Sequence, residues 1–362
     1  MKNTPFFCTF REVFFVTVAV LTSSLCTDKT LIFTGYCGTG APLSALLSGL
    51  AAIILVYFFV KRFYAYRCLN IIEQTEKSFG VWGKYLISIA FLVYLFVSSA
   101  HQLDQFTSFA KTLSFPTSPV WFVALLFSTA AFLGGLCGIR GLLKIAGIVI
   151  PLFIAVLALL FFSVLRNCDF SNLLPVYGNG ASSIARGGIS GLMLYSDVIL
   201  LFLILPATHS RKSTRRGILS GAVTAVIINF LLILAFTAKI PYPLSISEEF
   251  PLYTLSKEVY FGRFFQRIDA ILLLTSSLCN MLTLALYAAL ILQIFGQIAE
   301  DIPPSVVLGS WALTVFLFVS FINPLYPALP GSLLAATGIG ATVLAVITAL
   351  FVRKESRIPD ES

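Results

Sequence analysis

The sequence predicts an all-α membrane protein of about ten transmembrane helices. Of its 362 residues, 58% are apolar and 11% are charged, whereas soluble domains carry about 25% charged residues. The apolar runs are about 20 residues long, which is the length that an α-helix needs to cross a hydrocarbon core about 30 Å thick. They are not the alternating segments of about ten residues that build an outer-membrane β-barrel. We therefore expect one helical bundle within the lipid bilayer.

The apolar runs fall into two sets of five. The first set lies near residues 11–33, 42–60, 85–109, 120–138 and 145–165, and the second lies near residues 184–206, 218–238, 265–294, 306–322 and 332–352. We take residues 1–362 as a single transmembrane domain made of two repeats. The first repeat covers about 11–165 and the second about 184–352.

Lysine and arginine are distributed unevenly between the two sides of this bundle. With the N-terminus inside, 16 of the 24 basic residues fall on the inner side. Because cytoplasmic loops carry an excess of basic residues, we expect both termini in the cytoplasm. The basic loops are explained by this topology, and we expect no nucleic-acid partner.

An acidic residue lies near the centre of the sixth expected span, residues 184–206. Asp197 follows Tyr195 and Ser196 in an otherwise apolar run. A carboxylate at membrane depth costs at least ~2.5 kcal/mol on insertion scales, so it is seldom placed there without a use. We interpret the segment as a discontinuous helix whose middle faces a polar cavity. The alternative is a structural role, in which Asp197 caps backbone groups that the break has freed.

The first expected span has three small polar residues in its middle: Thr22, Ser23 and Ser24. Their hydroxyl groups can satisfy backbone carbonyls freed by local unwinding. The alternative is a small-residue face for helix packing. Interruptions at corresponding places in two repeats are the best sequence indication of the binding site in an inverted-repeat transporter fold.

Polar side chains on two further spans are candidates for closing the same cavity. Tyr94 and Ser98 lie on the third span, and Tyr287 lies on the eighth. For Tyr287 the alternative is aromatic packing. The eighth span also carries a polar stripe, which indicates either a cavity wall or hydrogen bonds between helices; it consists of Thr275, Ser276, Ser277, Asn280 and Thr283.

The sequence contains no signature of an enzyme or a metal site. Its seven cysteines are scattered without a CxxC pair, and it has two histidines. It has no Walker A loop and no HExxH motif. We therefore expect no catalytic residue, no metal ligand and no cofactor. A disulfide between Cys37 and Cys168, which both fall on the expected outer side, stays open at this point.

Two stretches carry a resemblance to a known family. Residues 169–180 read D-x-S-N-L-L-P-V-x-G-x-G, and residues 250–269 contain F-P-x-Y-x-L-S-K followed by G-x-F-x-x-R-x-D. A weaker third match places Arg11 with Phe14 and Phe15 at the head of the first span. In these features the chain resembles the spore germination permeases. These are the B subunits of nutrient germinant receptors in endospore-forming bacteria, within the amino acid–polyamine–organocation superfamily.

The resemblance implies a fold of two inverted five-helix repeats, like that of amino-acid transporters, used as a nutrient sensor. It also implies two partners in the spore inner membrane, an A-type subunit and a lipoprotein C-type subunit. Where the family usually has a Gly-Thr-Gly-like break, this chain has residues 22–24, Thr-Ser-Ser. Where the family usually has Gly-Glu in the sixth span, this chain has Ser196 and Asp197.

The expected mechanism starts with a small nutrient, an amino acid, entering from the outer side. Its carboxylate would bind backbone N–H groups at the two breaks, where half-helix N-termini are electropositive. Asp197 would meet an ammonium group or a proton, or would hold the broken helix open. The expected ligand-binding set is Thr22, Ser23, Ser24, Tyr94, Ser98, Tyr195, Ser196, Asp197 and Tyr287.

Three classes of function fit these features. A receptor subunit that triggers germination and a secondary transporter that moves an amino acid with H⁺ or Na⁺ need the same cavity. A scaffold that only anchors partners would give Asp197 a purely structural role. The family resemblance favours the receptor.

Overall fold

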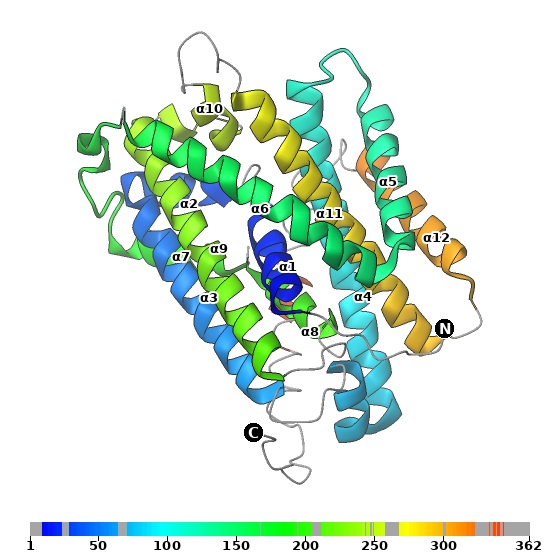
Figure 1. Cartoon of the computed structure of the whole chain (residues 1–362). Helices are drawn as coiled ribbons and strands as arrows, with labels where there is room; N and C mark the ends of the chain where they lie inside the picture. The colour runs from blue at the N-terminus through cyan, green and yellow to red at the C-terminus, as the bar shows by residue number, and fades with distance from the viewer. Residues whose placement is uncertain are drawn as a thin grey trace.

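The computed structural model of the chain describes residues 9–23, 29–63, 71–166, 168–193, 195–204, 211–242, 244–246, 248, 250–257, 268–299 and 302–322, with single positions between 333 and 343. All regular elements in these ranges are helical (Figure 1). In chain order they are α1 (Phe10–Thr22), α2 (Lys29–Cys37), η2 (Gly38–Gly40), α3 (Ala41–Phe63), α4 (Ile71–Leu113), α5 (Val120–Leu136), α6 (Gly138–Leu165), η3 (Phe170–Leu173), α7 (Ala181–Met193), η4 (Ser196–Leu200), α8 (Leu201–Ile204), α9 (Arg211–Lys239), η6 (Leu244–Ile246), α10 (Pro251–Lys257), α11 (Ile268–Ile298), α12 (Pro304–Leu317) and the π-helical turn η7 (Phe318–Ile322).

Six of the described helical segments are long and apolar enough to cross a membrane. They are Phe33–Lys61, Phe79–Leu113, Gly138–Leu165, Thr214–Lys239, Ile268–Ile298 and Pro304–Ile322, and α5 is a shorter apolar helix. These seven segments correspond to the second, third, fourth and fifth expected spans and to the seventh, eighth and ninth. The expected tenth span, 332–352, lies almost entirely outside the described residues.

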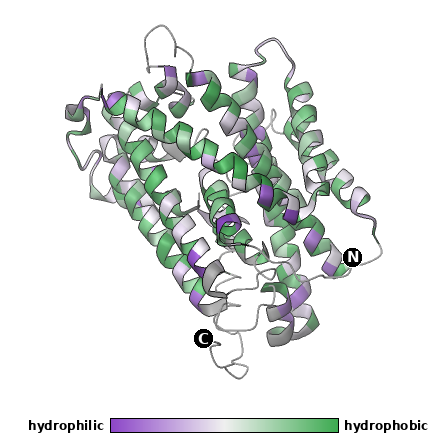
Figure 2. Ribbon diagram, viewed as in Figure 1, coloured by the Kyte–Doolittle hydropathy of each residue, from purple (hydrophilic) through white to green (hydrophobic). Residues whose placement is uncertain are grey.

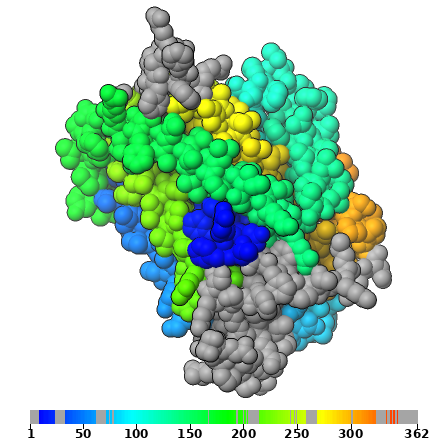
Figure 3. Space-filling model, in the orientation of Figure 1, coloured from blue at the N-terminus to red at the C-terminus, as the bar shows by residue number. Residues whose placement is uncertain are grey.

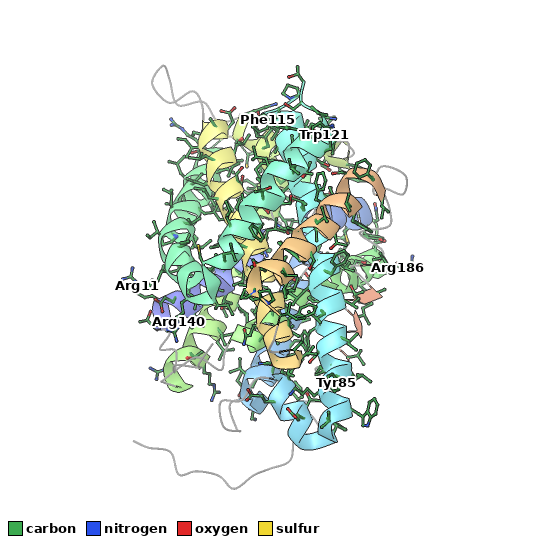
Figure 4. The ribbon with its side chains drawn as sticks, turned by 90° about the vertical axis from the view of Figure 1, so that its right-hand side faces the viewer. Arg11, Tyr85, Phe115, Trp121, Arg140 and Arg186 are labelled. Atoms are coloured by element: carbon green, nitrogen blue, oxygen red, sulfur yellow. The ribbon has the colours of Figure 1, made fainter. Side chains whose placement is uncertain are left out.

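The outer surface of the bundle suits a lipid environment. Hydrophobic residues predominate along the long helices (Figure 2). On α6, for example, Ile148 is 77% exposed and Phe162 is 71% exposed. Exposed aromatic residues lie toward the ends of the bundle, with Phe115 and Trp121 at one end and Tyr85 at the other (Figure 4). Aromatic residues at both ends are typical of the two membrane–water interfaces.

The first and sixth expected spans are each divided into shorter helices. The first is represented by α1 and α2, and the residues between them, 24–28, lie outside the described ranges. The sixth consists of α7, the 3₁₀ segment η4 and the single turn α8. The other expected spans that the structure describes contain one main helix each. The discontinuity expected for the sixth span is therefore confirmed by its helix boundaries.

Helix α1 packs in close contact with α9 and also against α6. It is seen nearly end-on in Figure 1, and its N-terminal end reaches the molecular surface in Figure 3. A Cβ atom at Gly221 of α9 would lie 2.8 Å from the Thr17 Cβ and 2.9 Å from the Phe14 carbonyl oxygen. Gly217, four residues earlier, faces the same helix. This G-x-x-x-G pair lets the two backbones approach closely.

Helix α4 has a sharp change of direction at Gly80, where φ is 74° and ψ is −167°. This conformation is open to glycine because it has no Cβ atom. The break separates a short amphipathic arm that begins at Ile71 from the long membrane helix, Phe79–Leu113. An ion pair of 3.1 Å between Lys84 and Glu76 connects the two arms.

The polar stripe on α11 makes hydrogen bonds within the bundle. The Gln102 side chain on α4 donates to the Asn280 side-chain oxygen, and the Asn280 amide donates to the Ser276 carbonyl at 2.9 Å. Nearby, the Trp311 indole on α12 donates to Ser99 on α4 at 3.1 Å. Asn280 thus joins α11 to α4, and Trp311 joins α12 to α4. Asn280 fits the interpretation as hydrogen bonds between helices, whereas the hydroxyls of Thr275, Ser276 and Thr283 bond to carbonyls of their own helix.

Candidate functional site

The backbone between α7 and η4 changes from α-helical to 3₁₀ hydrogen bonding. The Tyr195 amide donates to the Leu192 carbonyl at 3.0 Å, and the Val198 amide donates to the Tyr195 carbonyl at 3.1 Å. Both bonds span three residues instead of four, so the segment tightens and its side chains rotate relative to a continuous α-helix. Asp197 lies in the first turn of η4 as a result.

The Asp197 carboxylate lies between two tyrosines from different helices. Tyr94 of α4 donates its hydroxyl to Asp197 Oδ1 at 2.7 Å. Tyr287 of α11 donates to Oδ2 at 3.0 Å. Both tyrosines are buried, at 0% and 1% exposure, whereas Asp197 is half-buried. Bonds to an ionised acceptor are about twice as strong as neutral ones, so this carboxylate links η4 to both α4 and α11.

Ser196 extends the network by one bond. Its Oγ lies 2.8 Å from the Tyr94 hydroxyl oxygen. A tyrosine hydroxyl has one hydrogen, and Tyr94 gives that hydrogen to the acceptor-only carboxylate of Asp197. Ser196 therefore donates to Tyr94, and a directed chain of bonds runs from Ser196 through Tyr94 to Asp197.

Tyr195 is connected to the first interrupted span through Asn229 of α9. The Asn229 Nδ2 atom donates to the Tyr195 hydroxyl oxygen at 2.9 Å and to the Leu21 carbonyl at 3.5 Å. Leu21 is the penultimate residue of α1. Asn229 was absent from the expected site, although an isolated amide within the apolar span 218–238 was a signal available in the sequence.

The hydroxyl residues at the end of α1 bond to their own helix. Thr22 Oγ1 donates to the Val18 carbonyl at 2.7 Å, and Ser23 Oγ lies 3.4 Å from the Val20 carbonyl. Both side chains are buried. Bonds of this kind, to carbonyls three and four residues earlier in the same helix, are common for serine and threonine in helices. Ser24 lies outside the described residues.

The structure thus brings part of the expected set together by direct hydrogen bonds. Tyr94, Ser196, Asp197 and Tyr287 form one network, and Tyr195 is joined to α1 through Asn229. Ser98 is buried on α4, four residues after Tyr94. Within the described ranges, no group of three or more His, Cys, Asp or Glu side chains is placed to hold a metal ion. The Asp197 carboxylate and the side-chain oxygen of Asn229 are acceptors for a hydrogen-bond donor.

The first half of the motif at residues 169–180 makes polar contacts within itself and with α9. Asp169 accepts a bond of 2.9 Å from the Ser171 amide, and this interaction lowers the pKa of the Asp169 carboxyl. Asn172 donates to the Ala238 carbonyl at the end of α9 at 3.0 Å. The motif therefore fixes the approach of the chain to α7.

The second half of this stretch packs on the turn between α2 and α3. Thr39 Oγ1 donates to the Pro175 carbonyl at 2.6 Å, and the backbone N–H of Asn179 donates to the Cys37 carbonyl at 3.4 Å. Gly178 has a φ of 50°, and a Cβ atom there would lie 2.0 Å from the Cys37 carbonyl oxygen. We call these contacts between residues 37–40 and 175–180 the outer clip. The clip holds α2, the second half of the first span, beside α7, the first half of the sixth.

Cys37 and Cys168 do not form a disulfide. Both are free thiols, and Cys37 Sγ donates to the Ser183 carbonyl at 3.2 Å. The Cys168 Sγ atom donates to the Val164 carbonyl at 3.3 Å. Burial raises the pKa of the Cys168 thiol. The disulfide that the sequence left open is therefore not formed in the structure.

The second motif supplies aromatic contacts at the end of α4. The Phe250 ring lies 5.2 Å from the Phe109 ring, edge to face, and Tyr253 of α10 lies 6.4 Å from the same ring. Thr254 donates to the Glu248 carboxylate at 2.7 Å. Helix α10 lies at the top of the bundle in Figure 1, next to α11.

A profile of the family described as "Spore germination protein" matches residues 8–325. Spore germination protein KB of Bacillus subtilis (strain 168) is 21% identical over 255 residues, which cover 69% of this chain and 68% of that protein. Spore germination protein GerQB of Bacillus cereus is 28% identical over 211 residues, which cover 54% of each. The latter alignment thus spans about half the length of that relative.

Three solved structures have a similar fold. MhsT in complex with L-phenylalanine gives a TM-score of 0.69 at 13% identity, over 97% of this chain and 89% of that one. A substrate-bound, outward-open Na⁺-coupled sialic acid symporter gives 0.67 at 15% identity, over 94% and 78%. A closed conformation of Mhp1, a nucleobase-cation-symport-1 family transporter, gives 0.67 at 15% identity, over 96% and 80%. The chain therefore has the fold of these transporters, as its sequence predicted.

Proposed function

The chain belongs to the spore germination protein family, and we propose that it is the membrane subunit of a nutrient-germinant receptor that binds an amino acid. The single observation that carries the ligand site is the Asp197 carboxylate at the break of the sixth span, bonded by Tyr94 and Tyr287. An intramembrane carboxylate at a helix break is a functional-site hypothesis by default. The family supplies the context of germination.

The proposed ligand is recognised at both of its charged groups. Its carboxylate binds backbone N–H groups at the interrupted spans, where half-helix N-termini favour anions. Its ammonium group binds Asp197. The solved complex of MhsT with L-phenylalanine supports an amino acid as a ligand that this fold can hold.

Binding at Asp197 would change the contacts between helices. In the structure each carboxylate oxygen accepts a tyrosine hydroxyl, one from α4 and one from α11. An ammonium group that replaces one hydroxyl releases η4 from one of these helices. A ligand shifts a conformational equilibrium only through differential affinity for its states, and this exchange provides such a difference.

The partners and the location follow from the family and the charge pattern. We propose assembly with A-type and C-type receptor subunits in the spore inner membrane, with both termini in the cytoplasm. We also propose one domain with repeats over about 11–165 and about 184–352. The matched division of the first and sixth spans supports these repeat boundaries.

A second candidate function is secondary transport of an amino acid with H⁺ or Na⁺. The fold shared with a sialic acid symporter and with Mhp1 favours it. Uptake of labelled amino acid into vesicles at a rate set by an ion gradient would support transport, whereas binding without uptake would support the receptor.

The test uses the full-length chain purified into lipid nanodiscs. Its thermal unfolding midpoint is measured with each of the proteinogenic amino acids, because a ligand that binds the folded state raises the midpoint. Each amino acid that binds is compared with its deaminated and decarboxylated analogues. We expect both analogues to bind more weakly. If no amino acid raises the midpoint, amino-acid binding by this chain is excluded.

A further inference from the structure

We propose that the side-chain oxygen of Asn229 accepts a hydrogen bond from the amino group of the bound ligand and so makes Asn229 a specificity-determining residue. This inference rests on the proposed function. It adds a fourth element, α9, to a site that otherwise uses η4, α4 and α11.

Asn229 lies between the two interrupted spans. Its amide nitrogen reaches the Leu21 carbonyl near the end of α1 and the Tyr195 hydroxyl between α7 and η4. Tyr195 precedes Asp197 by two residues. The Asn229 side chain therefore contacts both interrupted spans.

The two partners also determine which way the amide points. A carbonyl oxygen can only accept a hydrogen bond. The atom facing the Leu21 carbonyl is therefore the nitrogen, and a flipped amide would bring two acceptors together. Asn229 Oδ1 consequently points away from this carbonyl.

Asn229 Oδ1 is a buried acceptor without a hydrogen-bond partner among the described residues. The side chain is 1% exposed. Buried polar atoms in folded proteins nearly always have a partner, and each exception calls for an explanation such as a bound molecule. A ligand donor explains this one.

The chemistry of the two acceptors defines the class of ligand. Asp197 contributes a carboxylate and Asn229 a neutral carbonyl oxygen, and both accept hydrogen. An ammonium group has several N–H donors in different directions and can bond to both. A carboxylic acid that lacks the amino group can bond to neither through that position. The pair would thus select amino acids over their deaminated analogues.

The experiment compares ligand pairs on the same protein. The probes are L-alanine with propanoate and L-phenylalanine with 3-phenylpropanoate, together with the equivalent pair for any other amino acid that binds. Dissociation constants are measured on the full-length chain in nanodiscs for the wild type, Asn229→Ala and Asn229→Asp. Thr237→Val is the matched control, because Thr237 is a buried polar residue of α9 whose hydroxyl bonds to its own helix at Ile233.

Asn229→Ala should weaken amino-acid binding about tenfold or more, because a bond to a charged donor is lost. Binding of the deaminated analogue should change less than about twofold, since that molecule has no donor for the missing oxygen. Asn229→Asp loses the N–H group that faces the Leu21 carbonyl, which should weaken binding of both molecules of a pair, but it keeps an acceptor and adds negative charge. The ratio of amino-acid affinity to analogue affinity should therefore rise. Thr237→Val should leave this ratio unchanged.

A purely structural role for Asn229 would weaken both members of a pair by the same factor in both variants. That result would overturn the inference while leaving the proposed function intact. If Asn229→Ala does not fold, Asn229→Asp provides the test. A ratio of amino-acid affinity to analogue affinity above that of the wild type supports the inference, and an unchanged or lower ratio overturns it. A wild type that binds no amino acid would overturn the proposed function, and this inference with it.

Discussion

Tyr94 and Tyr287 donate to opposite oxygens of one carboxylate, although they lie on different helices, α4 and α11. The distances from their hydroxyl oxygens to Asp197 are 2.7 and 3.0 Å. Each carboxylate oxygen therefore already accepts one bond from the protein in this state, out of about four acceptor sites on the group. We predict that an ammonium group that takes the place of one hydroxyl competes with that tyrosine for Asp197.

Tyr287→Phe removes one of these competing donors. We expect the ligand-free protein to lose about 1.5–3 kcal/mol of unfolding free energy, because a buried bond to a charged group is lost. Amino-acid affinity should rise by about threefold to tenfold, since less of the protein is held in the closed arrangement. The unfolding free energy is measured by denaturation, and the amino-acid affinity by ligand titration, both in nanodiscs.

Tyr85→Phe is the control for this substitution, because Tyr85 is an exposed tyrosine at one end of the bundle, nine residues before Tyr94 on α4 (Figure 4). It should change neither quantity. A fall in amino-acid affinity for Tyr287→Phe would contradict competition and would indicate that the tyrosine contacts the ligand directly.

Asp197→Asn tests the central acceptor. The amide loses the negative charge that attracts an ammonium group, so amino-acid affinity should fall at least about tenfold. Spores that carry this variant at normal protein level should lose their response to the amino acids that trigger wild-type spores. Asp169→Asn provides the control, because Asp169 lies outside the spans and caps η3. An unchanged germination response in the Asp197 variant would remove this residue from the site.

Much of this site was predictable because a charge in an apolar run is visible in the sequence. The choice of Asp197 as a candidate followed from its position alone. Its hydrogen-bond partners could not be predicted in the same way, because Tyr94 and Tyr287 lie 103 and 90 residues away in the sequence. Both were expected near the cavity, but only the packing of α4 and α11 around η4 shows that their hydroxyls reach the carboxylate.

Asn229 and the outer clip were harder to predict for physical reasons. A single amide among apolar residues gives no periodic pattern, and its partners Leu21 and Tyr195 are 208 and 34 residues away. The glycine pattern of residues 175–180 indicated a tight loop. That Gly178 faces the Cys37 carbonyl depends on a contact between distant segments, which local sequence does not encode.

Gly178→Ala should open the outer clip. An alanine at φ 50° costs about 1–2 kcal/mol in backbone strain, and its Cβ would lie 2.0 Å from the Cys37 carbonyl oxygen. We expect a total loss of about 3 kcal/mol or more in unfolding free energy, since overpacking typically adds about 1–3 kcal/mol. Faster hydrogen exchange in α2 and in the first turn of α7 should accompany the loss.

The matched control for the clip is Gly296→Ala in α11, where no atom lies within 4 Å of the new Cβ. It should be neutral or stabilising by up to about 1 kcal/mol, because alanine has a higher helix propensity than glycine. Equal stability of the Gly178 and Gly296 variants would show that the clip contributes nothing to holding α2 beside α7.

The last prediction concerns the crossing of α1 and α9. Gly221→Val places its side chain where Thr17 and the Phe14 carbonyl already lie within 3 Å of a Cβ, so α1 must move away from α9. Overpacking of this kind costs about 1–3 kcal/mol. Because Leu21 lies one turn beyond Thr17 on α1 and bonds to Asn229, the displacement should also weaken amino-acid binding.

Gly147→Val in α6, where nothing lies within 4 Å, should leave binding unchanged. Equal amino-acid affinity in both variants would show that the position of α1 does not control the site.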